Sequence, residues 1–293
     1  MKPVFIVGMP RTGSKIYKNI INAHTPINIS PEIFFLTPKW IRSDFLRTAK
    51  RLVGDMTRDE NIAKLSDLIF QGHFFGTYYR SIAGNKDRLT ELLRQSNRSP
   101  KGLLEALLRF DAEQHMKESI GAKFPVHITR AQTLVDWYPD ARFIHINRHP
   151  LAIYSSQKRK HLKNSVGALR RLVTVLSVLA ATVTSYRASY KFHLRNRQRP
   201  NYIFFQYEDL VSNPDVQVRR LCDFLEVQFV PEMLNPTSKG SSYENSNANG
   251  IHAASVDRWQ REIGAAERRV VTALVPRKWA TQTARPIPPS PSS

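Results

Sequence analysis

The segment from Gly8 to Lys15 carries residue types that bind phosphate. It reads Gly-Met-Pro-Arg-Thr-Gly-Ser-Lys, with two glycines, two hydroxyl side chains and two cations. Free backbone N–H groups in such a turn, together with the N-terminus of a following helix, can bind phosphate oxygens. Arg11 and Lys15 add positive charge at the same place. The segment therefore favours a phosphate site, and the alternative is an ordinary turn between a strand and a helix.

The spacing in this segment differs from that of a Walker A loop. A Walker A loop has four residues between its glycines and a Lys directly after the second glycine. Gly8 and Gly13 have the right separation, but Ser14 stands where the Lys should be, and no hydroxyl residue follows Lys15. A kinase-like enzyme that binds ATP at this loop stays open as an alternative. It would need a metal-binding Asp after a later strand, and residues 143–147 are followed by Arg148 instead.

Three further residues able to do chemistry each follow an apolar stretch of the chain. Glu32 follows residues 27–31, His127 ends the extended segment 121–127, and Arg148 follows residues 141–147. A carboxylate or an imidazole can take a proton from an acceptor, and an Arg offers a planar fork to phosphate oxygens. Each also has a structural interpretation. Glu32 could begin a helix after Pro31, His127 could be a buried imidazole with its hydrogen bonds satisfied, and Arg148 could be a surface arginine.

These residues are positioned by apolar stretches that alternate with helical patterns along the chain. Residues 4–7, 141–147 and 202–205 read as buried strands, and residues 16–21, 103–116, 166–194 and 256–274 have helical spacing, each typical of a single helix. This alternation predicts an α/β fold with three layers, in which a mostly parallel sheet has helices on both faces, as in P-loop NTPases. Ligands bind such sheets at the carboxyl ends of the strands. We therefore expect one cleft to collect Gly8, Glu32, His127 and Arg148.

Length and composition limit the domain organisation. The chain has 293 residues, enough for one sizeable core, and we predict a single domain over residues 1–275. Residues 276–293 contain five prolines and predict a disordered Pro-rich tail. The single cysteine, Cys222, excludes a disulfide framework within the chain and is expected in the core. No metal cluster is visible in the sequence.

The balance of charges points to an anionic partner. Lys and Arg number 44 against 24 Asp and Glu, a formal net charge of +20. Such a charge suits a nucleotide, a sulfated or phosphorylated glycan, an anionic lipid surface or nucleic acid, and a solvated basic surface is the alternative. The apolar stretch 172–183 is shorter than the roughly 18 residues of a membrane span, and residues 1–8 lack the apolar core of a signal peptide. We expect a cytoplasmic protein without a transmembrane segment, able to contact an anionic surface peripherally.

A resemblance to a known family rests on residues 143–156. They read Phe-Ile-His-Ile-Asn-Arg-His-Pro-Leu-Ala-Ile-Tyr-Ser-Ser. A buried strand ends at Arg148, and Ser156 lies eight residues further on in the next helix. Together with the loop at residues 8–15 and the block 201–225, this resembles the sulfotransferases that use 3′-phosphoadenosine 5′-phosphosulfate (PAPS). The carbohydrate, tyrosine and bacterial members are closer to it than the cytosolic steroid and phenol type. The resemblance implies that Arg148 and Ser156 bind the 3′-phosphate. It also implies that the 5′-phosphosulfate is bound by Arg11, Thr12, Gly13, Ser14 and Lys15.

The reaction implied by this resemblance moves the sulfonyl group of PAPS to a hydroxyl or an amine and leaves 3′-phosphoadenosine 5′-phosphate (PAP). Arg11 is expected at the leaving oxygen and Lys123 at the sulfonate. Glu32 is the first choice for the general base, because a Glu follows the second strand in carbohydrate and tyrosine sulfotransferases. His127 is the second choice.

The acceptor is expected to be a small molecule, a glycan or a lipid, in a pocket shaped by residues 40–120 and 235–255. No specific nucleic-acid partner is expected. A non-enzymatic module that binds polyanions through its basic surface is the alternative outside enzymes.

Overall fold

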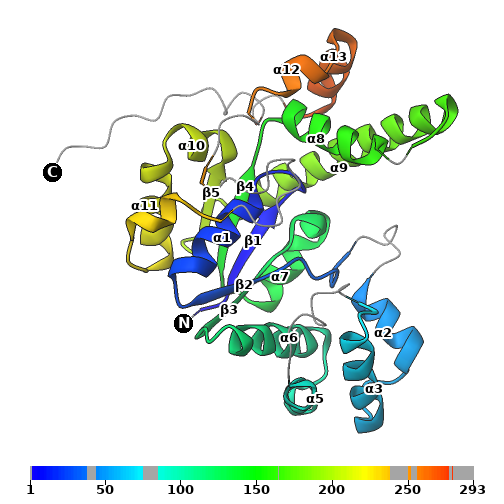
Figure 1. Ribbon diagram of the computed structural model, residues 1–293, viewed down its shortest axis with the longest axis vertical. Coiled ribbons are helices and arrows are strands. Elements are labelled where there is room, and N and C mark those ends of the chain that lie inside the picture. Colours follow the sequence, from blue (N-terminus) through cyan, green and yellow to red (C-terminus); the bar gives the residue numbers. More distant parts are fainter. Residues whose placement is uncertain are drawn as a thin grey trace.

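A parallel β-sheet forms the middle layer of the protein (Figure 1). The structure is a computed structural model, and it describes residues 2–37, 44–74, 85–163, 165–237, 250–251, 256–276 and 279. Within these residues the sheet has five strands in the spatial order β2-β3-β1-β4-β5. They are β1 (Val4–Gly8), β2 (Ile27–Ser30), β3 (Ser119–Lys123), β4 (Arg142–Asn147) and β5 (Tyr202–Gln206). Every neighbouring pair is parallel, so all five carboxyl ends lie along one edge.

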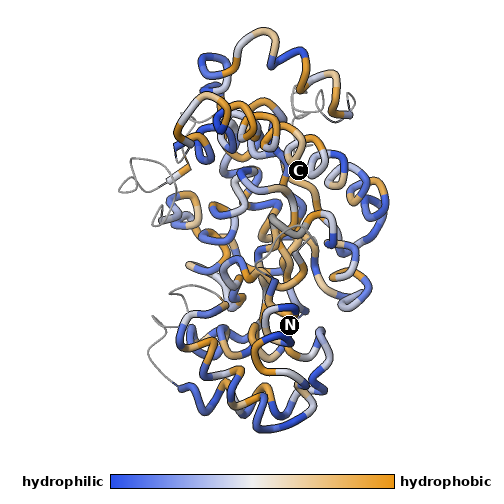
Figure 2. Tube along the Cα trace, turned by 90° about the vertical axis from the view of Figure 1, so that its right-hand side faces the viewer, coloured by the Kyte–Doolittle hydropathy of each residue, from blue (hydrophilic) through white to orange (hydrophobic). Residues whose placement is uncertain are grey.

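Alternate residues of the strands enter two separate apolar cores. Val4 and Ile6 of β1 belong to one core, and Phe5 and Val7 belong to the other. This alternation follows from the two-residue period of a strand, and both faces are apolar because both are covered. Figure 2 shows the hydrophobic strands in the middle of the molecule. The predicted three-layer α/β architecture is confirmed.

One face of the sheet is covered by helices from the beginning and the end of the chain. They are α1 (Ser14–His24), α10 (Tyr207–Ser212), α11 (Pro214–Leu225) and the short η2 (Pro231–Leu234). Cys222 of α11 is buried here, beside the Met233 sulfur, as expected for a core cysteine.

The other face is covered by the middle of the chain. Its helices are α6 (Pro100–Gln114), η1 (Pro125–Arg130), α7 (Ala131–Trp137), α8 (Pro150–Leu162) and α9 (Ala168–Asn196). Below them lie α2 (Phe45–Val53), α3 (Asp59–Phe70) and α5 (Lys86–Gln95), and α12 (Trp259–Glu262) and α13 (Ala265–Leu274) pack near α8 (Figure 1).

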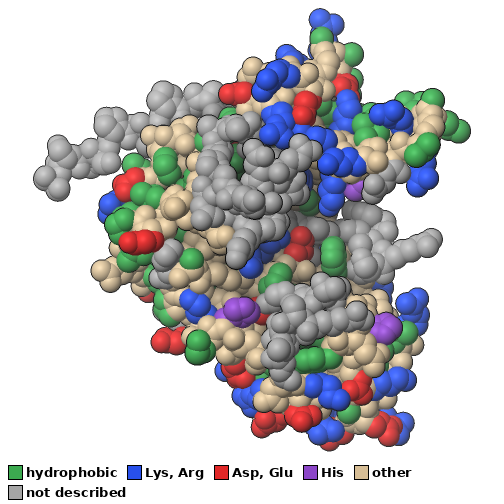
Figure 3. Space-filling view, in the orientation of Figure 1, with side chains coloured by type: hydrophobic (Ala, Val, Ile, Leu, Met, Phe, Trp, Pro, Cys, Tyr) green, Lys and Arg blue, Asp and Glu red, His purple; other side chains and the backbone are tan. Residues whose placement is uncertain are grey.

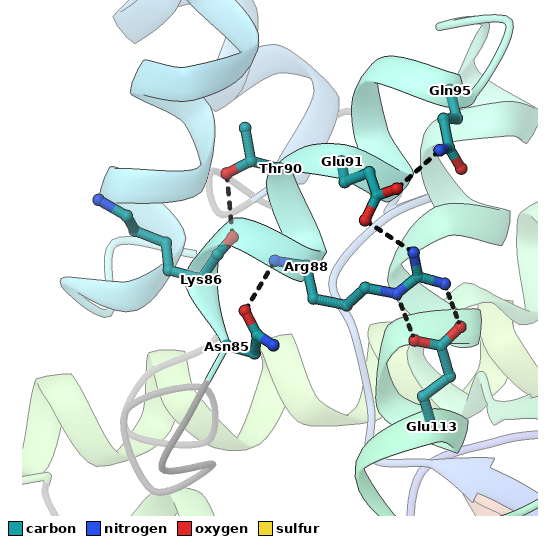
Figure 4. A network of polar contacts seen from close by, with 7 residues as sticks. All are labelled: Asn85, Lys86, Arg88, Thr90, Glu91, Gln95 and Glu113. Carbon is teal, nitrogen blue, oxygen red and sulfur yellow. Dashed lines mark hydrogen bonds and ion pairs between the residues drawn. The ribbon is translucent and has the colours of Figure 1, made fainter.

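Helix α5 is fastened to α6 by charged side chains. Arg88 donates from Nε and Nη2 to both carboxylate oxygens of Glu113 at 2.8 Å, and from Nη1 to Glu91 at 2.8 Å (Figure 4). The fork geometry of the guanidinium matches a carboxylate in this way. These groups are exposed, so they fix the orientation of α5 more than they stabilise the fold.

Two predicted elements differ from the observed ones. The extended segment predicted over residues 121–127 ends at Lys123, and η1 begins at Pro125, which has no N–H to continue the ladder. The single amphipathic helix expected between Val256 and Leu274 is instead two helices, α12 and α13. They separate at Gly264, whose N–H donates to the Glu267 carboxylate at 3.4 Å.

The division into a domain and a tail stays a prediction. Of residues 276–293, the structure describes Pro276 and Trp279. The Trp279 ring is buried and lies 4.8 Å from the His193 ring and 5.0 Å from that of Tyr190.

Candidate functional site

The carboxyl edge of the sheet brings most of the predicted residues together in a simple order. Each strand is followed by polar residues, and the spatial order of the strands fixes their neighbours. Along the edge these groups are Glu32 after β2, Lys123 at the end of β3, the loop 8–15 after β1, Arg148 after β4 and Tyr207 after β5. This is the edge at which open α/β sheets bind ligands. The loop after β1 therefore lies between the ends of β2 and β3 on one side and the ends of β4 and β5 on the other.

The loop between β1 and α1 is held in a shape that glycine permits. Gly8 has a φ of 145°, and a Cβ there would lie 2.3 Å from the Ile146 carbonyl oxygen. Gly13 has a φ of 89°, and a Cβ there would lie 2.2 Å from the Tyr207 ring. Thr12 is fully buried and its hydroxyl donates to the Met9 carbonyl at 2.9 Å. The loop is therefore built by close backbone approach and internal bonding.

Helix α1 begins directly after this loop without a side-chain cap. Gly13 is its N-cap residue and offers no side-chain oxygen, and Ser14 begins the helix. The N–H groups of a first helical turn have no partner within the helix, and they carry partial positive charge. This helix end therefore suits an anion, as the sequence predicted.

The second predicted phosphate site, Arg148 and Ser156, touches the loop directly. The Arg11 Nε donates to the Ser156 hydroxyl at 2.7 Å, across 145 residues of chain. The Arg148 Nη1 donates to the Arg11 carbonyl at 3.3 Å, and the Arg148 guanidinium lies 4.4 Å from the Tyr207 ring centroid. The Arg148 side chain is almost fully buried, at 3% exposure. Two predicted phosphate-binding clusters thus form one continuous site.

Helix α12 closes the outer side of this cluster. The Trp259 ring stacks on the His149 ring, with centroids 4.8 Å apart, and Glu262 accepts from the Ser155 hydroxyl and pairs with Arg159. A small hollow is enclosed here, lined by Arg148, Ala152, Ser155, Ser156, Arg159, Arg258 and Trp259. The hollow has a volume of about 10 Å³, room for about one water, so the three arginines and two serines around it must move apart to admit an anion with several oxygens.

Two buried groups beside Arg148 have altered pKa values. Burial, with a smaller contribution from the Arg148 charge, lowers the pKa of His149 to about 4. Burial raises the pKa of Glu208, whose carboxylate accepts from the His149 backbone N–H at 2.9 Å. His149 is therefore neutral at pH 7 and serves as a flat surface for Trp259.

The predicted catalytic residues Glu32 and Lys123 form an ion pair at the other end of the edge. The Lys123 Nζ lies 3.3 Å from the Glu32 Oε2, and both side chains are largely buried. Burial lowers the pKa of Lys15, and the nearby Lys123 charge lowers it further. The Glu32–Lys123 pair therefore lies close enough to the loop for the charges of Lys123 and Lys15 to interact. His127 lies in η1, and its side chain falls outside the described part of the structure.

Sequence reasoning did not assign roles to Tyr207, Glu208, Arg258 and Trp259. A signal existed for the first two, because they follow β5 directly, as Arg148 follows β4. None existed for Arg258 and Trp259, which reach the site only through packing of α12 on α8. His145, which the apolar pattern of its strand places in the core, is indeed buried in β4, within 2.7 Å of the Tyr202 hydroxyl and 2.8 Å of Ser189.

A larger hollow of ≈ 440 Å³ lies elsewhere, between α3 and α5. It is lined by Asp59, Asp87, Thr90, Glu91, Arg94, Gln95 and Arg98, and Arg98 pairs with Asp59. None of these residues follows a strand of the sheet. Among the described residues there is no group of three His, Cys, Asp or Glu able to hold a metal ion.

Comparison with known proteins gives one family. Residues 3–231 match the model described as "Sulfotransferase family". Omega-hydroxy-beta-dihydromenaquinone-9 sulfotransferase Stf3 of Mycobacterium bovis and of Mycobacterium tuberculosis is 26% identical over 244 residues, 76% of this chain and 62% of the relative. The chain thus spans about three fifths of the length of these curated relatives.

Solved structures show the same fold. The sulfotransferase domain of the Synechococcus PCC 7002 olefin synthase has a TM-score of 0.59 at 22% identity, over 98% of this chain and 95% of that domain. The sulfotransferase domain from the curacin biosynthetic pathway has a TM-score of 0.56 at 18% identity, over 93% of this chain and 96% of that domain.

Proposed function

This chain belongs to the sulfotransferase family, and we propose that it transfers the sulfonyl group of PAPS to a hydroxyl group of an apolar acceptor. The observation that carries the proposal is the direct contact between the two phosphate-type clusters. The Arg11 side chain reaches Ser156, and the Arg148 side chain reaches the Arg11 backbone. A nucleotide with phosphates on both its 3′ and 5′ positions needs two adjacent anion sites of this kind.

The residues present fit the donor nucleotide. Arg148 and Ser156 are assigned to the 3′-phosphate, because a buried guanidinium and a hydroxyl face the same hollow. The 5′ side is assigned to the loop residues Arg11, Thr12, Gly13, Ser14 and Lys15, where the uncapped start of α1 supplies N–H groups. The bound donor supplies an activated sulfonyl group.

The other end of the edge is assigned to the acceptor. Glu32 takes the proton from the acceptor hydroxyl as the new S–O bond forms, and the bond to the phosphate oxygen breaks to leave PAP. Lys123 and Lys15 stabilise negative charge that develops between Glu32 and the loop. His127 is the alternative base. Glu32 and His127 are each proposed as the base because each follows a strand at the carboxyl end of the sheet.

The acceptor class follows from the relatives. The mycobacterial relatives are named for an omega-hydroxylated dihydromenaquinone, a hydroxyl group on an apolar chain. We assign this chain an acceptor of the same chemical class, a long apolar alcohol. The charge of +20 suits a sulfated product and an anionic donor equally well.

A titration and a transfer assay test the proposal. Isothermal titration of the full chain with PAP and with ATP–Mg²⁺ should show tight binding of PAP and weak binding of ATP. Incubation with PAPS labelled in the sulfonyl group and a long-chain alcohol should then label the alcohol. Preference for ATP would favour the kinase-like alternative. Binding of PAP no tighter than that of any polyanion, and abolished by salt, would favour a non-enzymatic module.

A further inference from the structure

The end of α8 and the beginning of α9 project from the body of the protein as an arm (Figure 1). The arm comprises residues 158–177, of which the structure describes all except 164. None of residues 168–177 is buried, and the first buried residue of α9 is Val178. Beyond Val178 the helix packs against the body through Thr182, Tyr186 and Phe192. The arm is therefore an exposed extension of two well-anchored helices.

Large apolar side chains gather on one side of this arm. The exposed fraction is 84% for Val166, 76% for Leu169, 57% for Leu172, 54% for Val173 and 56% for Leu176. Positions 169, 172, 173 and 176 recur every three or four residues and so form one stripe along the helix. The stripe lies on the side of the helix opposite Val178. A stripe of this size on an exposed helix indicates a surface that binds something apolar.

The charged residues along the arm itself are all basic, and Lys158 and Arg159 at its base pair with Glu267 and Glu262. Between residues 150 and 200 the chain has 11 Lys and Arg and no Asp or Glu. Lys160, Arg170 and Arg171 are exposed on the arm itself. Figure 3 shows hydrophobic side chains beside Lys and Arg at the end of the projecting α9. Leucines flanked by basic residues without acidic ones are the composition of a helix that lies in an anionic membrane interface.

We propose that this arm docks the protein on an anionic lipid bilayer, with the Leu169–Leu176 stripe in the headgroup region and Arg170 and Lys160 beside the lipid phosphates. Arg171, on the opposite side of the helix, still lies within about 10 Å of the surface and is attracted by it. By length and composition α9 could cross a membrane. Its second half is packed in the body, however, and residues 168–177, none of which is buried, extend only about 15 Å, half of the roughly 30 Å hydrocarbon core. The arm therefore lies in the interface and does not span it.

The charges also favour a bilayer over a second copy of the chain. In a symmetric dimer the same surface faces itself, so Arg170 beside the stripe would face the Arg170 of the second copy. Anionic headgroups instead complement this charge. Helix α8 leads from the arm to Ser155 and Ser156, and its last residue, Leu162, lies six residues or about 9 Å along the helix from Ser156, so docking would fix the distance between the bilayer and the candidate site. The docking itself does not depend on the reaction.

Vesicle flotation of the full chain tests this inference. The wild type should float with vesicles of equimolar phosphatidylcholine and phosphatidylglycerol and stay behind with phosphatidylcholine alone. Leu172→Gln with Leu176→Gln should lower the partition coefficient at least about tenfold, because two apolar side chains no longer enter the interface. Arg170→Gln with Arg171→Gln should lower it about thirtyfold, because roughly 1 kcal/mol of attraction is lost with each charge. Leu194→Gln with Arg195→Gln, at the other end of the same helix, should leave it unchanged.

A labelled variant makes the depth of the arm visible. Cys222 is buried, so a cysteine introduced by Leu172→Cys can be labelled selectively with an environment-sensitive fluorophore. Its emission should shift to the blue with anionic vesicles, and PAP binding should be unchanged in every variant. Flotation lost with the arginine pair and kept with the leucine pair would reduce the contact to surface adsorption and overturn the proposal. So would a wild-type dimer in sedimentation that the leucine pair converts to monomer.

Discussion

The two ends of the strand edge are built differently. The end assigned to the nucleotide, around Arg148, is buried and tied across the chain: Arg11 to Ser156, Arg148 to Tyr207, and Ser155 to Glu262. The end assigned to the acceptor has one ion pair at 3.3 Å between Glu32 and Lys123. The end assigned to the nucleotide is thus held in place by contacts within the protein. The other places a few charges beside an acceptor whose own surface completes the site.

The two ends should therefore affect different quantities, the affinity for PAP at one end and the rate of sulfonyl transfer at the other. Changes at the nucleotide end should lower the affinity for PAP, because its charged groups are assigned to the phosphates. Changes at the acceptor end should lower the rate and leave the affinity for PAP intact.

The largest effect is expected from Glu32→Gln. Loss of the carboxylate that takes the acceptor proton should lower kcat by roughly a hundredfold to ten-thousandfold. The affinity for PAP, measured by titration, should stay within about twofold, because this residue lies at the acceptor end of the edge. Glu60→Gln, an exposed carboxylate on α3, is the matched control. An unchanged kcat would move the role of the base to His127.

Gly13→Ala tests how rigid the nucleotide end is. The added Cβ would lie 2.2 Å from the Tyr207 ring, and the φ of 89° already disfavours a side chain. We expect a loss of about 2–4 kcal/mol in the free energy of unfolding, measured in urea, and weaker PAP binding. Gly167→Ala separates the two causes, because Gly167 has a φ of 84° but nothing within 4 Å of a Cβ. With a ψ of 146°, Gly167 lies in a region essentially confined to glycine, so Ala there should cost about 1–3 kcal/mol through backbone strain alone and leave PAP binding unchanged. Unchanged PAP binding in Gly13→Ala would mean that Tyr207 does not clamp the loop.

Acid should loosen the nucleotide end through His149. Its pKa is about 4 in the folded protein against an ordinary 6.5, so the unfolded chain binds the proton first as the pH falls. The contribution to stability is complete above about pH 6.5 and is lost progressively towards pH 4, by about 2 kcal/mol at pH 5. His149→Asn should reduce the difference in unfolding free energy between about pH 7.5 and pH 5 by that amount.

The exposed His73→Asn is the control for that measurement. His145 and His193 are also buried with lowered pKa values, so part of the pH dependence should persist in the His149 variant. An undiminished dependence in His149→Asn would mean that this imidazole is protonated in the folded protein.

The sequence predicted the fold and the membership of the sulfotransferase family, and both are confirmed. The prediction was possible because each apolar strand segment ends at or just before a recognisable residue, Gly8, Glu32 or Arg148. These residues therefore lie at the ends of strands. Parallel strands then place those ends on one edge. The roles assigned to Glu32, Lys123 and His127 remain predictions.

Packing between distant parts of the chain was beyond such reasoning. Spacing along a sequence carries no sign that the Tyr207 ring lies against Gly13, or that Glu262 fixes Ser155. The exposed stripe on α9 was equally hidden, because apolar spacing is the same for a helix face that is buried and one that is not. Which residues cover a helix is decided by tertiary contacts alone.

The most direct test of the account compares two nucleotides on three proteins. PAP and adenosine 5′-phosphate differ only in the 3′-phosphate, so titrating both isolates its site. Arg148→Ala should weaken PAP binding at least roughly thirtyfold and leave adenosine 5′-phosphate within about twofold, because one charged partner of a single phosphate is removed. Lys15→Ala should weaken both nucleotides alike. If Arg148→Ala weakens both nucleotides equally, or neither, the two strand ends do not hold opposite phosphates of one ligand.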